Sequence, residues 1–137
     1  MEIEFTREDD AFKLKSSQFK SPIWVDTCHV GENQSDAPRP MQLFLASLGS
    51  CSSIDILNIL YKARNRVEDY RISIHGNRVD EVPAVFDRIT LHLELRGEIK
   101  EKTLQQAIKL TKEKYCSVIR MLKEEIKVEF TYTIMPS

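Results

Sequence analysis

Residues 41–60 form the longest apolar stretch of the chain, and they constrain the fold more than any other segment. Pro40 precedes the stretch and suits the first position of a helix, where its missing N–H costs no hydrogen bond. The pattern predicts a helix to about Arg66 with apolar residues on nearly every side, so both main faces should be buried. Polar residues such as Asp55 argue against a transmembrane helix and for a buried one.

The length of the chain limits how this helix can be covered. We expect one domain over 1–137, because 137 residues suit a single hydrophobic core. One thin sheet covers only one face of a helix, so the other face needs a second layer, most simply a partner subunit. We therefore predict an intimate homodimer. The small residues Gly49, Ser50, Ser52 and Ser53 suit a place where another backbone packs very close.

Alternating apolar and polar residues predict strands on both sides of this helix. Three short strands are expected in the first 28 residues, around Ile3–Phe5, around Phe12–Leu14 and after Pro22. Two further strands are expected around 71–75 and 88–96, and Gly97 should end the second of them. A second helix over 104–122 and a last strand over 126–134 should follow. The order βββ-α-ββ-α-β indicates an α+β fold with mostly antiparallel pairing.

Charge and composition exclude several classes of partner. The net charge is −1, from 20 basic and 21 acidic residues, so nothing indicates nucleic-acid binding. The basic residues are interspersed with acidic ones, which argues against a membrane-surface patch. The first residues are charged and do not resemble a secretory signal, and three cysteines without such a signal favour a reduced state. We therefore expect a cytoplasmic protein.

Two cysteines carry the chemistry that the sequence suggests. Cys51 lies in LGSCSSID and Cys116 in EKYCSVI, both apolar segments with helical patterning. They are far apart in the sequence, so no short metal or redox motif joins them. If the fold brings them together, they form a dithiol in an apolar pocket, which suits peroxide reduction. The alternative for each cysteine alone is a small core residue.

The segments RPMQLFLASLGSCSSIDIL and EKYCSVI, with the strand pattern between them, resemble the OsmC/Ohr family. The resemblance covers roughly residues 1–134. It implies an OsmC-like fold, with two long central helices wrapped by two sheets in an intertwined homodimer. It also implies two active sites at the subunit interface, thiol-dependent reduction of organic hydroperoxides, and no metal, haem or flavin cofactor.

The resemblance assigns roles to particular residues. Cys51 matches the peroxidatic cysteine and Cys116 the resolving cysteine, which would form a disulfide that an external dithiol reduces. An arginine activates the thiolate in the hydroperoxide-resistance members, and Arg7 or Arg39 is the candidate here. Those members carry Pro-Glu at the start of the helix, where this chain has Met41 after the proline.

Four further residues are candidates for substrate binding. Phe44, Leu48 and Tyr115 would line a channel for an alkyl hydroperoxide, or they are plain core residues. Asp55 lies one helical turn after Cys51. Its carboxylate has two candidate functional roles, which are to hold the activating arginine or to oppose the thiolate by like charge. The alternative is a structural acid bonded to a helix end or to a buried basic group.

The histidines add little to this site. Cys28-His29 invites comparison with a metal ligand pair, but nothing else has ligand spacing, so we expect no metal. His75 and His92 fall on the predicted solvent faces of strands.

The first hypothesis is therefore a thiol peroxidase. The alternative is a non-catalytic OsmC-like dimer that binds an apolar small molecule at the subunit interface. A cysteine-based acyl-transfer enzyme ranks last, because no histidine occupies an obvious base position.

Overall fold

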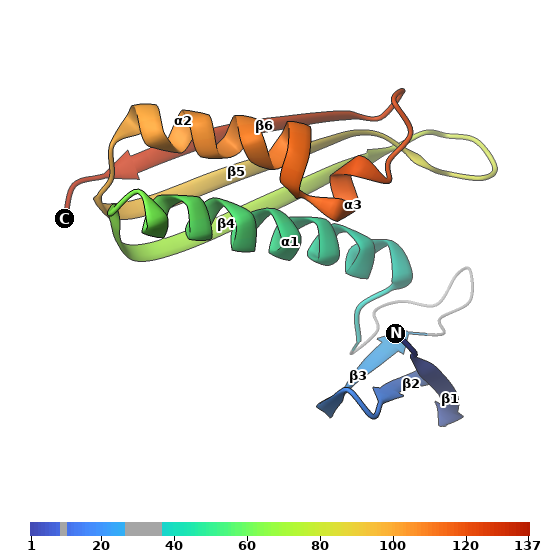
Figure 1. The fold of residues 1–137 in the computed structure, drawn as a ribbon. Coiled ribbons are helices and arrows are strands. Elements are labelled where there is room, and N and C mark those ends of the chain that lie inside the picture. The colour runs from blue at the N-terminus through green and yellow to red at the C-terminus, as the bar shows by residue number, and fades with distance from the viewer. Residues whose placement is uncertain (9–10, 27–36) are drawn as a thin grey trace. The chain divides into compact units, whose positions relative to one another are not determined.

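A computed structural model describes residues 1–8, 11–26 and 37–137. The chain divides into two compact units, Met1–Phe44 and Leu45–Ser137, and the boundary falls within the first helix, α1. The elements follow the order βββ-α-ββ-α-β, with the second helical region in several pieces (Figure 1). This order confirms the predicted α+β class.

The N-terminal unit contains a three-stranded antiparallel sheet in the order β1-β2-β3. The strands are β1 (Glu4–Glu8), β2 (Ala11–Ser16) and β3 (Phe19–Asp26). The third strand begins before Pro22, not after it as expected. Proline is tolerated because β3 is an edge strand of this sheet and the register shifts between Leu14 and Ser16, opposite this segment.

Helix α1 (Pro40–Lys62) begins at the predicted proline. The Arg39 backbone N–H donates a hydrogen bond to Gln42 Oε1 at 2.8 Å, which satisfies one donor at the helix start. The helix ends at Lys62, before the predicted Arg66, because Arg64 turns into the left-handed region with φ of 62°.

The C-terminal unit contains a second sheet in the order β4-β5-β6. Its strands are β4 (Arg66–Arg78), β5 (Phe86–Glu98) and β6 (Lys127–Met135). The β4–β5 pair is antiparallel, whereas β5–β6 is parallel. The parallel pair follows from the helical crossover between these strands, since parallel neighbours cannot be joined by a tight turn. The expected mostly antiparallel pairing is confirmed with this exception.

Helices α1 and α2 (Glu101–Leu110) cover one face of this sheet (Figure 1). Alternate residues of β5 are fully buried, including Leu93 and Leu95, while the intervening residues lie on the solvent face, as predicted. The central cluster draws on all three elements and comprises Ile56, Leu60, Leu93, Leu95, Leu104 and Ala107.

The second helical region is not the continuous helix over 104–122 that the periodicity predicts. Helix α2 ends at Leu110 and continues as a π-helical turn, η1 (Thr111–Tyr115). Cys116 is extended, with φ of −73° and ψ of 108°, and the short α3 (Ser117–Arg120) follows. Apolar spacing alone does not distinguish α from π turns, because a π turn shifts the stripe by a single residue.

Much of α1 is uncovered within one chain. By length and composition this helix is apolar enough to cross a membrane. Only 28% of its most apolar segment of 18 residues is buried inside the chain. Its inner side packs in the core through Leu48, Ile56 and Leu60, whereas Ile54 is 61% exposed and Tyr61 80% exposed. The sheet therefore covers one side of α1, as the sequence predicts.

We predict that Gly97→Ala destabilises the protein. Gly97 does not end β5 as expected but lies within it at φ of 141°, where a Cβ would overlap the Arg66 carbonyl oxygen. Such strain costs about 1–3 kcal/mol, and urea unfolding followed by circular dichroism should show a loss of this size. The exposed Glu98→Ala is the control, with a change within about 0.5 kcal/mol. Equal stability of both variants would contradict the prediction.

Candidate functional site

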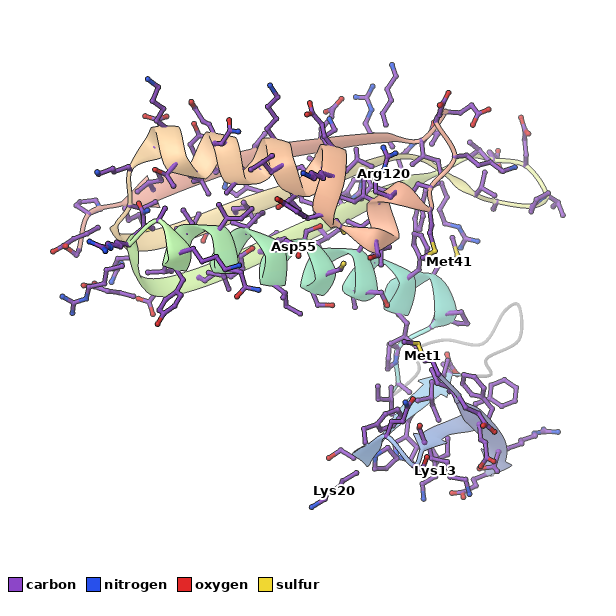
Figure 2. The ribbon with its side chains drawn as sticks, in the orientation of Figure 1. Met1, Lys13, Lys20, Met41, Asp55 and Arg120 are labelled. Carbon is purple, nitrogen blue, oxygen red and sulfur yellow. The ribbon has the colours of Figure 1, made fainter. Side chains whose placement is uncertain are left out.

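The fold of the C-terminal unit brings Cys51 and Cys116 together. Their sulfur atoms and a carboxylate oxygen of Asp55 all lie within 4.8 Å of one another. Cys51 and Asp55 are one turn apart on α1, and Cys116 comes from the break between η1 and α3. Asp55 lies on α1 on the side of the α2–α3 region (Figure 2). Neither cysteine is in a disulfide; Cys51 is half-buried and Cys116 is fully buried.

Ser52 connects the two helical segments beside the thiols. Its hydroxyl donates to the Leu48 carbonyl oxygen at 2.8 Å and lies 3.6 Å from Cys116 Sγ. Because a hydroxyl has one proton, and Leu48 takes it, Ser52 is left to accept from the Cys116 thiol. Burial raises the pKa of the Cys116 thiol, and the neighbouring Cys51 thiol adds to the rise. Cys116 is therefore held as a neutral thiol.

Small residues let α1 approach the sheet closely, although the neighbour that meets Gly49 is a side chain and not the backbone that the sequence led us to expect. A Cβ on Gly49 would overlap the Ile74 side chain of β4. Ser53 donates to the Gly49 carbonyl oxygen at 2.7 Å and accepts from the Tyr70 hydroxyl at 2.8 Å. Burial raises the pKa of Tyr70, so its hydroxyl remains a donor. The Tyr70 bond ties α1 to β4 at Ser53, which lies between Cys51 and Asp55 in the sequence.

A pocket of about 480 Å³ opens next to the thiols. Asp55 and Tyr115 line it, together with Asn58, Ile59, Lys62, Ala63 and Leu110. Sequence reasoning missed Lys62, although its place two turns after Asp55 on one helix was the available signal. The apolar lining and the two charged residues make this pocket suitable for an amphiphilic small molecule.

The other predicted substrate residues lie elsewhere. Leu48 is fully buried, as the plain-core alternative predicts. Phe44 belongs to the N-terminal unit.

Asp55 lines the pocket, and one of its carboxylate oxygens, Oδ2, is buried without a hydrogen bond to the described residues. A structural acid bonded to a helix end or a basic group does not account for this oxygen.

Both candidate arginines lie in the N-terminal unit, whereas both cysteines lie in the C-terminal unit. Arg7 is in β1, paired in register with Phe12. Arg39 precedes α1, and its Nε lies 3.4 Å from Asp26 Oδ2. Activation of Cys51 by either arginine stays a prediction.

The remaining sequence candidates lie apart from the thiols or outside the described residues. Cys28 and His29 are outside the described residues. His92 is on the solvent face of β5, where its Nδ1 lies 2.7 Å from Thr131 Oγ1. His75 is an exposed residue of β4.

Comparisons with known proteins show which family and which solved structures this chain is similar to. Residues 31–131 match the family described as OsmC-like protein. Protein YhfA of Escherichia coli strain K12 is 35% identical over 106 residues, covering 77% of this chain and 79% of YhfA. A hypothetical protein from Aquifex aeolicus VF5 has 31% identity and a TM-score of 0.85, covering 99% of this chain and 96% of that one.

A solved organic hydroperoxide resistance protein has the same fold. The protein of Elizabethkingia anophelis aligns with a TM-score of 0.73 over 98% of this chain and 97% of its own. The two are 17% identical, so this likeness shows the fold alone.

We predict that Cys51 reacts with alkylating agents faster than Cys116. Cys51 is half-buried, whereas Cys116 is fully buried and bonded to Ser52. Reduced protein carrying Cys28→Ser should be treated with iodoacetamide and digested at intervals, and mass spectrometry should find carbamidomethyl on Cys51 first. The same protein in urea is the control, because unfolding should make the two rates similar. Faster labelling of Cys116 in the folded protein would contradict the prediction.

Proposed function

Because the chain belongs to the OsmC-like protein family, which includes organic hydroperoxide resistance peroxidases, we propose that it is a thiol peroxidase acting on organic hydroperoxides. The observation that supports this most directly is the closeness of the Cys51 and Cys116 sulfurs, within 4.8 Å. Two thiols at this separation reach disulfide distance with modest motion. We place the activity in oxidative-stress defence in the cytoplasm.

The proposed reaction uses the two sulfurs in sequence. The Cys51 thiolate attacks the distal peroxide oxygen and, with one proton, yields a Cys51 sulfenic acid and an alcohol. The Cys116 thiol then attacks the sulfenic sulfur, forming the Cys51–Cys116 disulfide and water. An external dithiol returns both cysteines to thiols and is itself oxidised to a disulfide.

Exposure and hydrogen bonding support this division of roles. Cys51 is the more accessible thiol, which suits first contact with a peroxide. Cys116 is buried and bonded to Ser52, which suits a resolving thiol that meets only the sulfenic acid. The pocket lined by Tyr115, Leu110 and Ile59 offers apolar surface for the alkyl part of the substrate.

We also propose that the protein is a homodimer with each active site at the subunit interface. The exposed apolar side of α1, with Ile54 at 61% and Tyr61 at 80% exposure, needs a covering layer. The sheet of its own C-terminal unit covers the opposite side. A second copy meets this need with a self-complementary surface.

A second candidate function is binding of an apolar ligand without catalysis. A separate pocket of about 510 Å³ in the N-terminal unit favours it. Phe5, Phe12, Val25, Pro40 and Leu43 line this pocket. Native mass spectrometry distinguishes the two functions: a co-purifying lipid or fatty acid favours binding, and ligand-free protein with rapid peroxide turnover favours catalysis.

Cys51→Ser should abolish consumption of cumene hydroperoxide, because no other described thiol offers a comparable exposed sulfur beside a partner thiol. Cys116→Ser should still reduce one equivalent, and its sulfenic acid should be trapped by dimedone and detected by mass spectrometry. Cys28→Ser is the matched control and should retain turnover. Turnover by Cys51→Ser equal to that of the wild-type protein would rule out the proposed function.

Light scattering coupled to size exclusion should give twice the mass of one chain. Ile54→Asp places a charge on the exposed apolar side of α1 and should shift the protein toward a monomer, since a buried unpaired charge costs several kcal/mol. Ser73→Asp, on the solvent face of β4, is the control and should leave the mass unchanged. A monomeric wild-type protein at high concentration would exclude the homodimer.

A further inference from the structure

Two thiols and one carboxyl group converge on one place in the C-terminal unit. The Cys51 and Cys116 sulfurs and an Asp55 carboxylate oxygen lie within 4.8 Å of one another. Two of them come from successive turns of α1, and the third comes from the extended residue between η1 and α3. The convergence therefore results from tertiary packing and not from spacing along one helix.

The separations suit a tetrahedral cation. Zinc binds sulfur at about 2.3 Å and carboxylate oxygen at about 2.0–2.2 Å, so its ligand atoms lie about 3.5–3.8 Å apart. The three atoms, already within 4.8 Å, reach this spacing by closing at most about 1.3 Å. Rotation of side chains about χ1 supplies such a movement without a change in the backbone.

The Asp55 carboxylate gives an independent reason for a cation. Its Oδ2 is buried and has no hydrogen-bond partner among the described residues. An unsatisfied buried polar atom costs about 1–3 kcal/mol, and more when it carries charge. A bound cation beside the carboxylate would remove this cost.

We propose that Cys51, Asp55 and Cys116 bind one thiophilic divalent cation of the zinc type. Two sulfurs and one carboxylate oxygen are donors that zinc accepts, whereas magnesium and calcium prefer oxygen alone. Binding converts both thiols to thiolates, releases two protons and leaves the fourth coordination position to water. The pocket that Asp55 lines provides the route by which the ion enters.

The cation site does not require the proposed peroxidase function, but the two uses of the thiols compete. A sulfur in the Cys51–Cys116 disulfide has no thiolate to offer a metal, and a thiolate that donates to a metal is a weaker nucleophile toward a peroxide. The cation would thus protect the reduced dithiol, and formation of the disulfide would release the cation.

Cobalt(II) is the probe, because thiolate coordination gives an intense charge-transfer absorption in the near-ultraviolet. Titration of the reduced full-length protein under argon should develop this band with one ion per chain, and added zinc should abolish it. Asp55→Asn should weaken cobalt affinity by at least about tenfold, the scale on which even outer partners of metal ligands act. Cys28→Ser is the matched control and should bind like the wild-type protein.

Protein carrying Cys28→Ser and alkylated at Cys51 with N-ethylmaleimide tests the site without substituting a ligand, and it should lose the band while keeping its circular dichroism spectrum. Absence of the band in reduced wild-type protein at saturating cobalt would overturn the proposal. So would full retention of affinity in Asp55→Asn, or loss of the band in Cys28→Ser. None of these measurements involves a peroxide, so they separate failure of the cation site from failure of the peroxidase function.

Discussion

The packing of α1 on the sheet of the C-terminal unit determines where the reactive groups of that unit lie. Leu48, Ile56 and Leu60 are fully buried on the inner side of the helix, and each contributes about 1.5–3 kcal/mol by leaving water. Gly49 lets the helix come close to β4. The serine hydroxyls on this segment donate to helix carbonyls, so the close contact leaves no unpaired hydroxyl at Ser52 or Ser53. This packing fixes the position of Cys51 relative to the sheet.

The break in the second helical region places the other sulfur. A continuous α-helix through residue 116 would carry its side chain around the axis by the regular 100° step. The π turn and the extended conformation of Cys116 replace this step, and they bring its sulfur beside Ser52 and Cys51. Local irregularities of this kind occur often at functional sites, because regular helices offer few directions for a side chain.

The sequence allowed the order of elements and the buried face of β5 to be predicted, because both depend on local periodicity. The family motif singled out Cys51 and Cys116, which the fold brings together. The break at Cys116 was not predictable, since an apolar stripe continues through a π turn nearly unchanged. The parallel pairing of β6 was missed because strand direction depends on the route of the crossover. Asp55 was identified as a candidate by its one-turn spacing from Cys51, but its closeness to Cys116 depends on tertiary packing. The N-terminal arginines remain unassigned, because they belong to the other compact unit.

The parallel pairing of β5 and β6 also affects how the unit folds. The β4–β5 hairpin joins neighbouring segments and requires closure of only a short loop, whereas β6 reaches β5 after α2, η1 and α3. Contacts of longer sequence separation form more slowly, because more chain entropy is lost before they form. Cys51 and Cys116 are also remote in sequence, so their encounter belongs to this slower class. We therefore expect the two sulfurs to meet late in folding, which limits the time during which an incompletely packed chain holds two adjacent reactive sulfurs.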